Sequence, residues 1–406
     1  LYDSPTPLRR EKKRLLPSST TGKFKLCKHG QKGKLLASQA SGGIIGMIFN
    51  DVTQLWRVRV KISLISVLSV MAAVVSLLIP TVALAQSAPE GWTAPRTADG
   101  RPDLGGVWAN NNATPIERPE AWAGKDVLGD EELAAVMAAA VEAGDPGQDA
   151  LFGDQLILAA IEKSKAESYD PTTGNYNQFW IADRVFNTNR TSLVVNPSNG
   201  RIPSTTAAAD ASIERATQRL VDHPADWTTD RPLSERCITY GAPNIFAGYN
   251  SYFQLIQGAD YVSIVQEMIH DARIIPIDGP PHLDKRIEQL HGDPRGHWDG
   301  DTLVIETTNY NGQNVVLAGL SFTTASTDLT VTERITRVSP EILNYEVTFD
   351  DPAVWESPWT VLIPLRYSQE PIFEYACHEG NIGMDGILAG HRALERDAAM
   401  TEAGSR

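Results

Sequence analysis

The sequence lacks the short motifs that identify several common classes of enzyme. It contains no Gly-x-Ser-x-Gly elbow, no P-loop, no dinucleotide-binding glycine pattern and no His-Glu-x-x-His helix. These patterns hold a nucleophile, a phosphate or a zinc ion through a fixed local geometry. Their absence argues against the common serine hydrolases, zinc proteases and nucleotide-dependent enzymes, so no nucleotide cofactor is expected.

Positive charge is also scarce. The chain has 36 Lys and Arg against 50 Asp and Glu, which gives a formal net charge of −14 at pH 7. The basic residues are concentrated before residue 86, so the remainder of this acidic protein is more negative still. Such a surface repels phosphate backbones. This argues against nucleic acid as a partner.

Long apolar runs are absent except for one, at residues 62–79. The residues that flank this run are Arg57, Arg59 and Lys61 before it, and Pro80 and Ala83-Leu84-Ala85 after it. A basic start, an apolar centre and a small-residue end are typical of a cleaved signal peptide. Residues 47–85 are therefore predicted to be a signal peptide. The protein is expected to be periplasmic or secreted, with no membrane contact after cleavage.

Residues 1–46 precede this signal, and Met47 would begin it at an ordinary length. We interpret 1–46 as a non-native or disordered lead. An uncleaved membrane anchor is the alternative, because the apolar run approaches the ~20 residues that span a bilayer. The proline and the Ala-x-Ala pattern favour cleavage.

Cysteine is rare, with three in the whole chain. Cys27 precedes the predicted cleavage site, which leaves Cys237 and Cys377 in the exported part. An oxidising compartment favours a disulfide between these two. Free buried thiols or a thiolate metal site are the alternatives.

Residues 86–235 are predicted to form an irregular segment of mixed helix and hairpin. Helices are expected from Asp130, over residues 151–168 and over residues 209–221. A short strand is expected at residues 103–108, and a hairpin around the turn residues 196–200.

Residues 236–395 are predicted to be a β domain, followed by a disordered tail over 396–406. The expected strands are residues 252–257, 261–269, 272–277, 302–310, 329–338, 342–349, 360–367 and 372–377. About eight strands with short connections indicate an antiparallel meander that closes into a calycin- or lipocalin-like barrel. The predicted fold class is therefore mainly β, with an irregular α+β segment in front.

Alternation of apolar and polar residues supports these strands, although it leaves open which face is the lumen. Glu306, Glu333 and Glu346 each fall in the middle of a strand. We expect them on the solvated outer face. In a polar lumen they would need Arg334, Arg366 or a proton to be buried.

Several stretches of the exported part resemble a family of exported bacterial proteins, found among soil acidobacterial and marine sequences and uncharacterised in activity. These stretches are residues 97–104, 192–203, 267–273, 292–309 and 375–381. The resemblance implies export and a single inherited unit from about residue 90 to 395. It implies no catalytic residues. The likeness to lipocalin barrels is an analogy of architecture, which carries no function.

The densest cluster of ionisable residues contains Glu267, His270, Asp271 and Arg273. On an extended strand Glu267, Asp271 and Arg273 would share one face and His270 would point to the other. A histidine near carboxylates is suited to general base catalysis, because its pKa is easily moved around neutrality. An ion pair that stabilises a turn explains the cluster equally well.

A second cluster, His378 and Glu379, follows directly after Cys377. If the final strand pairs with an early one, His378 comes close to His270. A disulfide at Cys377 would then hold His378 and Glu379 rigidly, as a preorganised site requires. A purely structural staple would look the same in the sequence.

The loop at residues 291–301 is rich in His, Asp and Arg. Arg295 is a candidate for binding an anionic group and Trp298 for contacting a ligand, together with Glu267 and Arg273. No standard metal pattern is present. A divalent metal is nevertheless possible, and the expected ligands would be His270, His378 and Glu379.

These observations favour an exported enzyme that performs acid–base chemistry of the lyase, hydrolase or isomerase type on a small organic or sugar-derived molecule. Its predicted catalytic residues are His270, Asp271, His378 and Glu379. The main alternative is a non-catalytic periplasmic protein that binds an apolar or aromatic ligand in the barrel. Its candidate aromatics are Trp298, Trp355, Trp359 and Tyr375. A surface or envelope interaction module is a third, weaker alternative.

Overall fold

The computed structural model describes residue 89 and residues 91–144, 154–163, 184–318 and 321–404. The predicted lead, the signal peptide and Cys27 lie outside the described residues, as do both ends of the helix expected at residues 151–168. Thr81–Arg406 forms one compact unit, so the irregular segment and the β domain belong together.

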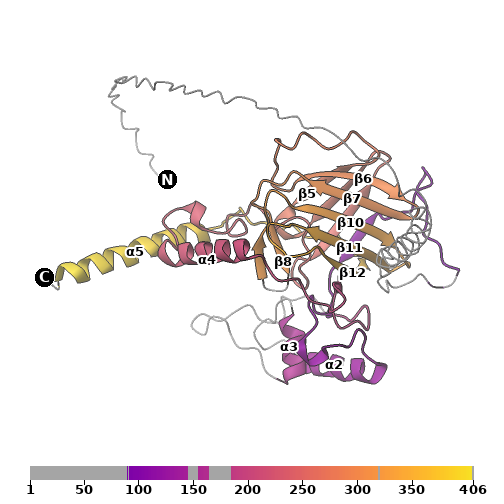
Figure 1. Cartoon of the computed structure of the whole chain (residues 1–406), viewed down its shortest axis with the longest axis horizontal. Helices are drawn as coiled ribbons and strands as arrows, with labels where there is room; N and C mark the ends of the chain where they lie inside the picture. Colours follow the sequence, from indigo (N-terminus) through magenta and orange to yellow (C-terminus); the bar gives the residue numbers. More distant parts are fainter. Residues whose placement is uncertain (1–88, 90, 145–153, 164–183, 319–320, 405–406) are drawn as a thin grey trace, which may run out of the picture. The chain divides into compact units, whose positions relative to one another are not determined.

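In the described part of the chain a 10-stranded antiparallel sheet dominates the fold (Figure 1). Its path runs β5-β4-β3-β1-β12-β11-β10-β7-β6, and β2 pairs with β12 beside that path. The strands are β1 Gly106–Ala109, β2 Val194–Asn196, β3 Tyr252–Gln257, β4 Tyr261–Gln266, β5 Ala272–Pro276, β6 Asp293–Asp299, β7 Thr302–Thr308, β10 Thr330–Arg337, β11 Ile342–Asp350 and β12 Trp359–Ser368. A separate hairpin joins β8 Val315–Ala318 to β9 Ser321–Thr324.

The two end strands of this path, β5 and β6, meet and nearly close the sheet into a barrel. Ile277 and Gly296 form a parallel bridge, and the backbone N–H of Asp278 donates to the carbonyl of Gly296 at 2.8 Å. The predicted mainly β, antiparallel, barrel-forming fold is therefore confirmed. The last strand, β12, pairs with the early strands β1 and β2, whereas residues 372–377, which were predicted to make this pairing, are not a strand.

Alternating burial shows which face of each strand points inward. In β10 the side chains of Val331, Glu333 and Ile335 are buried, and those between them are half-buried. The inward residues of all the main strands pack into one apolar cluster. The interior of the barrel is thus a packed core, as is usual for small barrels.

The irregular segment before β3 completes the sheet. β1 pairs with β3 on one side and with the end of β12 on the other, and β2 pairs with the start of β12. The single edge of β12 is therefore shared by two short strands that are far apart in the sequence.

Helices lie outside the barrel (Figure 1). The α-helices are α2 Asp130–Ala143, α3 Gln155–Glu162, α4 Ala207–Asp222 and α5 Gly383–Gly404; the 3₁₀ turns are η1 Glu120–Trp122, η3 Thr228–Asp230 and η4 Met268–His270. Helices α2 and α3 pack together through a small apolar cluster that includes Ile157 and Trp122. Among the described residues, no helix has the length and apolarity needed to cross a membrane.

Residues 237–251, called here the capping loop, contact strand ends at one end of the barrel. The side-chain amide of Asn110, just after β1, donates to the carbonyls of Ile245 and Phe246. Asn314 exchanges two hydrogen bonds with the backbone of Ala242. Ile245 is fully buried and belongs to the barrel core. The capping loop is therefore part of the core.

Residues 369–382, called here the crossover segment, run from β12 to α5. Cys377 in this segment forms a disulfide with Cys237 at the start of the capping loop, with a Cα–Cα distance of 5.7 Å. The predicted pairing of these two cysteines is confirmed. The disulfide ties the crossover segment to the capped end of the barrel.

The crossover segment corrects one predicted strand. Residues 372–377 are not a strand in the structure. Pro371 starts the stretch, the N–H of Phe373 donates to the Glu267 carboxylate, and Cys377 is in the disulfide. The stretch is held by a side-chain carboxylate and by a disulfide, and not by hydrogen bonds to a neighbouring strand. It therefore does not join the sheet.

Two other predictions differ from the structure. Residues 293–299, predicted as part of a polar loop, form β6, because pairing with β7 outweighs the low strand propensity of its Pro, Gly and Asp residues. Residues 396–404, predicted as a disordered tail, continue α5. This stretch contains strong helix formers, and the ion pairs of Glu395 with His391 and Arg392 stabilise the helix just before it.

Candidate functional site

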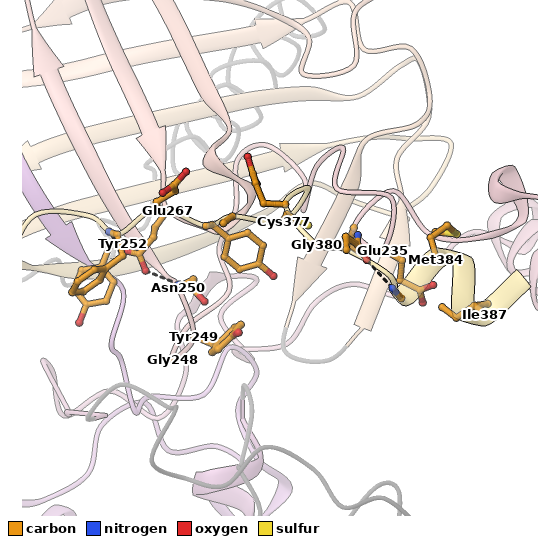
Figure 2. A pocket seen from close by; sticks show the side chains of 18 residues that line it. Glu235, Gly248, Tyr249, Asn250, Tyr252, Glu267, Cys377, Gly380, Met384 and Ile387 are labelled. Carbon is orange, nitrogen blue, oxygen red and sulfur yellow. Dashed lines mark hydrogen bonds between the residues drawn. The ribbon is translucent and has the colours of Figure 1, made fainter. Parts of the chain in front are cut away.

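A groove of about 870 Å³ lies at the capped end of the barrel (Figure 2). Its walls come from residues 234–235, the end of the capping loop, the start of β3, Glu267 after β4, the crossover segment and the start of α5. Segments distant in the chain therefore build it, and the disulfided Cys377 is among its lining residues.

Glu267 is the buried carboxylate of this groove, with a relative exposure of 3%. The side-chain amide of Asn250 donates to one carboxylate oxygen at 2.8 Å, and the backbone N–H of Phe373 donates to the other at 2.9 Å. Figure 2 shows Glu267 and Asn250 joined by this bond. The groove thus holds Glu267 in a fixed orientation, and Glu267 in turn holds the crossover segment.

Three further glutamates line the groove, namely Glu235, Glu374 and Glu379. Glu235 is already paired, because Arg231 donates to both of its oxygens at 2.7 and 2.8 Å. Glu374 and Glu379 are exposed on the crossover segment. The charge of the groove is therefore negative.

Aromatic side chains form much of the remaining wall. Tyr249 and Tyr252 come from the capping loop and β3, and Phe373 and Tyr375 come from the crossover segment. Phe373 is 69% exposed, so its ring faces the groove rather than the core. Trp355 and Trp359, considered above as ligand contacts, instead pack in the barrel core, where Trp359 stacks on Phe349 at 4.5 Å.

The structure brings His270 and His378 together next to residues that line this groove, although neither histidine is among the lining residues. Their ring centroids are 6.4 Å apart, and both residues are exposed. Nδ1 of His270 lies 3.1 Å from the carbonyl oxygen of Tyr375. A carbonyl can only accept, so Nδ1 is the donor in this contact and Nε2 is left without a hydrogen bond to the Tyr375 backbone.

The local backbone explains the position of His270. The β4 strand ends at Gln266, and Ile269 and His270 have φ values of 56° and 47°. This left-handed turn lifts His270 out of the sheet. It also separates the side chains of Glu267, Asp271 and Arg273, which an extended strand would have placed on one face. The strand predicted over residues 261–269 is correspondingly shorter.

Asp271 belongs to a polar network behind the histidine pair. The hydroxyl of Thr239 donates to Asp271 at 2.7 Å, and Nε2 of His291 lies 2.9 Å from the same hydroxyl. Burial raises the pKa of the Asp271 carboxyl. Burial lowers the pKa of His291, against the opposing effect of the Asp271 charge. The two groups are therefore shifted toward each other and can exchange a proton through Thr239.

Replacing His291 with Gln is expected to change how stability depends on pH. The pKa of His291 is lower in the folded state than the ordinary 6.5. As pH falls, the unfolded chain therefore takes up this proton first, and the wild type loses stability on acidification. Between about pH 7.5 and 5.5, the free energy of unfolding measured in urea should fall less for the variant than for the wild type. His297→Gln, at an exposed position on β6, is the control. If the free energy of unfolding of His291→Gln changed with pH as steeply as that of the wild type, the expectation would be contradicted.

The remaining predicted binding residues lie elsewhere. Arg273 is buried in the barrel, where it donates to both oxygens of Glu333 at 2.6 and 2.8 Å. Glu333 is therefore inside, contrary to the expectation of an outer face, and its partner is neither Arg334 nor Arg366. Glu306 is exposed and Glu346 half-buried on the other face.

Arg295 and Trp298 lie on β6 and do not line the groove. Arg295 donates to Asp293 and to the carbonyl of Pro280, at 2.6 and 2.9 Å. Trp298 packs against the barrel core, and the guanidinium of Arg101 lies 5.8 Å from its ring centroid. Both side chains are used in contacts within the fold.

One cluster with metal-ligand geometry occurs in the described ranges, formed by Asp226, His391 and Glu395. Their ligand atoms lie within 4.8 Å of one another, whereas His270, His378 and Glu379 form no such group. Arg392 also contacts Glu395 at 2.7 Å and Asp226 at 3.9 Å. Its positive charge already neutralises these carboxylates, which disfavours a cation.

Comparisons with known proteins give no relative for this chain. No protein-family model matches it, no curated protein is similar to it, and no solved structure matches it. The resemblance to exported bacterial proteins and the analogy to lipocalins stay predictions.

Several site residues were not predicted from the sequence. Asn250 and Tyr249 reach the groove from the capping loop and Tyr252 from the start of β3, and no sequence motif marks these positions. His291 and Thr239 meet Asp271 only because the capping loop and the start of β6 converge on the β4–β5 connection. The sequence signal for this network was the density of ionisable residues in the loop that contains His291.

Proposed function

We propose that the protein is an exported enzyme that performs acid–base chemistry on a small organic or sugar-derived molecule bound in the groove. The observation that carries this proposal is the pair of imidazoles, His270 and His378, 6.4 Å apart beside a groove that contains a buried carboxylate. Two imidazoles at this distance can remove a proton from one atom of a substrate and deliver one to another. This chemistry serves lyases, hydrolases and isomerases alike.

The chain's own residues suggest the roles. His270, whose Nδ1 is engaged by the Tyr375 carbonyl, would act as the base through Nε2, with His378 as the partner acid. Asp271, next to His270, has a raised pKa and links to His291 through Thr239, so it could relay the proton away. Glu379 would orient His378 or the substrate. A positioned acid or base of this kind typically contributes 10²–10⁴-fold in rate.

Export is supported by the disulfide between Cys237 and Cys377, because such bonds persist in oxidising compartments. Arg273 is left out of the proposal, since its guanidinium is occupied by Glu333 in the barrel interior. A binding role for an anionic group therefore lacks support.

The test is a substrate screen with matched variants. Wild-type protein is incubated with sets of esters, lactones, glycosides and hydroxy or amino acids, and products are detected by mass spectrometry. His270→Ala and His378→Ala should each lower turnover at least ~100-fold while circular dichroism stays unchanged. His297→Ala, at an exposed site on β6, is the control and should retain full turnover. Unchanged turnover in both histidine variants would reject the proposal.

A second candidate function is carriage of an aromatic ligand in the same groove. The observation that favours it is the exposed aromatic wall, with Phe373 69% exposed. The packed apolar cluster inside the barrel supports the groove, rather than the lumen, as the ligand site. Native mass spectrometry of protein from its own host would retain an intact organic ligand if carriage is the function.

A further inference from the structure

We infer that the groove binds an organic cation, an amine or a quaternary ammonium compound, through carboxylates and aromatic rings. This inference names the ligand class of the site proposed above, and rests on that proposal only for the site's location.

The groove is lined by acidic residues without basic ones. Four of its lining residues are glutamates, and within the described part of the chain neither Lys nor Arg lines it. Arg231 neutralises Glu235 from outside the lining. Glu267, Glu374 and Glu379 leave an uncompensated negative field, which raises the local concentration of cations.

Glu267 gives the strongest single argument. It is 3% exposed, and among the described residues no Lys, Arg or His pairs with it within 4.0 Å. Its two hydrogen-bond donors, the amide of Asn250 and the N–H of Phe373, are both uncharged. Buried charges in proteins are normally paired. A cation in the groove would supply the missing partner.

Aromatic rings favour an organic rather than a strongly hydrated cation. Tyr249, Tyr252, Phe373 and Tyr375 line the same groove. A ring face attracts an ammonium group through its quadrupole, and cages of aromatic residues recognise quaternary ammonium ligands in this way. The 69% exposure of Phe373 leaves its ring available for this contact.

The spacing of the carboxylates argues against a metal ion. The groove glutamates are absent from the described clusters whose ligand atoms gather within 4.8 Å. A metal ion needs its oxygen ligands at 2.0–2.6 Å from a single point. Carboxylates spread over about 870 Å³ suit a polyatomic cation whose charge is shared over several methyl or N–H groups.

The experiment compares two probes of equal shape. Isothermal titration calorimetry is performed with choline and with 3,3-dimethylbutan-1-ol, in which a carbon replaces the charged nitrogen. Choline should bind at least ~10-fold more tightly, as expected for a cation–π contact combined with a carboxylate. Equal affinities, or no binding of choline, would overturn the inference.

Variants identify the groups involved. Glu267→Gln should weaken choline binding at least ~10-fold, and its binding of the neutral alcohol should stay unchanged. Because Glu267 also holds Phe373, Phe373→Ala and Glu379→Gln serve as second variants at exposed positions. Glu306→Gln, on the exposed face of β7, is the control. Full choline affinity in all three groove variants would overturn the inference.

The same measurements separate this inference from the proposed catalysis. His270→Ala and His378→Ala should bind choline normally, since neither imidazole is used to attract the cation. Selective choline binding without any turnover would support the ligand class and reject the enzyme. Turnover of a neutral substrate without choline selectivity would support the enzyme and reject the ligand class.

Discussion

Replacing Arg273 with Met is expected to lower the free energy of unfolding by about 3–5 kcal/mol. Arg273 and Glu333 have side-chain exposures of 3% and 0%, and they form a two-point ion pair inside the barrel. Removing Arg273 would leave the carboxylate of Glu333 buried without its counter-charge. Leaving a charge buried in this way costs more than the ion pair itself contributes.

Urea unfolding of a small set of variants would check this expectation. The double variant Arg273→Met/Glu333→Met should recover most of the loss, because it leaves no buried charge. Full recovery is not expected, since the hydroxyl of Tyr345 donates to Glu333 and would lose its acceptor. Arg334→Met, which breaks a pair with Asp299 at the surface, should cost at most about 1 kcal/mol. If Arg273→Met lowered the free energy of unfolding by less than about 1 kcal/mol, the expectation for the buried pair would be contradicted.

Removal of the disulfide is the second change with a large expected effect. Cys237→Ser/Cys377→Ser should lower the free energy of unfolding by roughly 4–5 kcal/mol in the chain-entropy model, for a sequence separation of 140 residues. The measurement is urea unfolding of the double variant and of wild type with and without reductant. Equal unfolding free energies for oxidised and reduced wild type would contradict the prediction.

The disulfide should also affect the groove more than the barrel. The crossover segment is not part of the sheet, and the disulfide and the bond from Phe373 to Glu267 hold it in place. Probe binding in the groove should therefore weaken under reducing conditions in which near-ultraviolet circular dichroism of the core is retained. Arg334→Met, a substitution outside the groove, serves again as the control.

The barrel could be predicted because its strands show alternating burial and are separated by turn residues. β10 and β11 illustrate this, since their inward and outward residues follow the period of two. β6 was missed because a strand with Pro294 and Gly296 has no such period. Its place in the sheet comes from pairing with β7 and from the contact with Ile277, which are tertiary effects.

The candidate site was harder to predict, because partners distant in the sequence decide it. The sequence shows that Glu333 is in a strand, but not that Arg273, 60 residues earlier, faces it across the barrel. Likewise the expected route for His378 to His270 was a paired strand. The structure uses a disulfide and the contact from His270 to the backbone of Tyr375 instead. No local pattern encodes either contact.

The order of the segments along the chain has a further consequence. The last strand, β12, ends at Ser368, and the crossover segment follows it. Every strand in the described ranges is therefore synthesised before the wall that carries Phe373 and Glu379. Assembly of the barrel and completion of the groove are separate events in time, and oxidation of Cys377 decides when the second one becomes permanent.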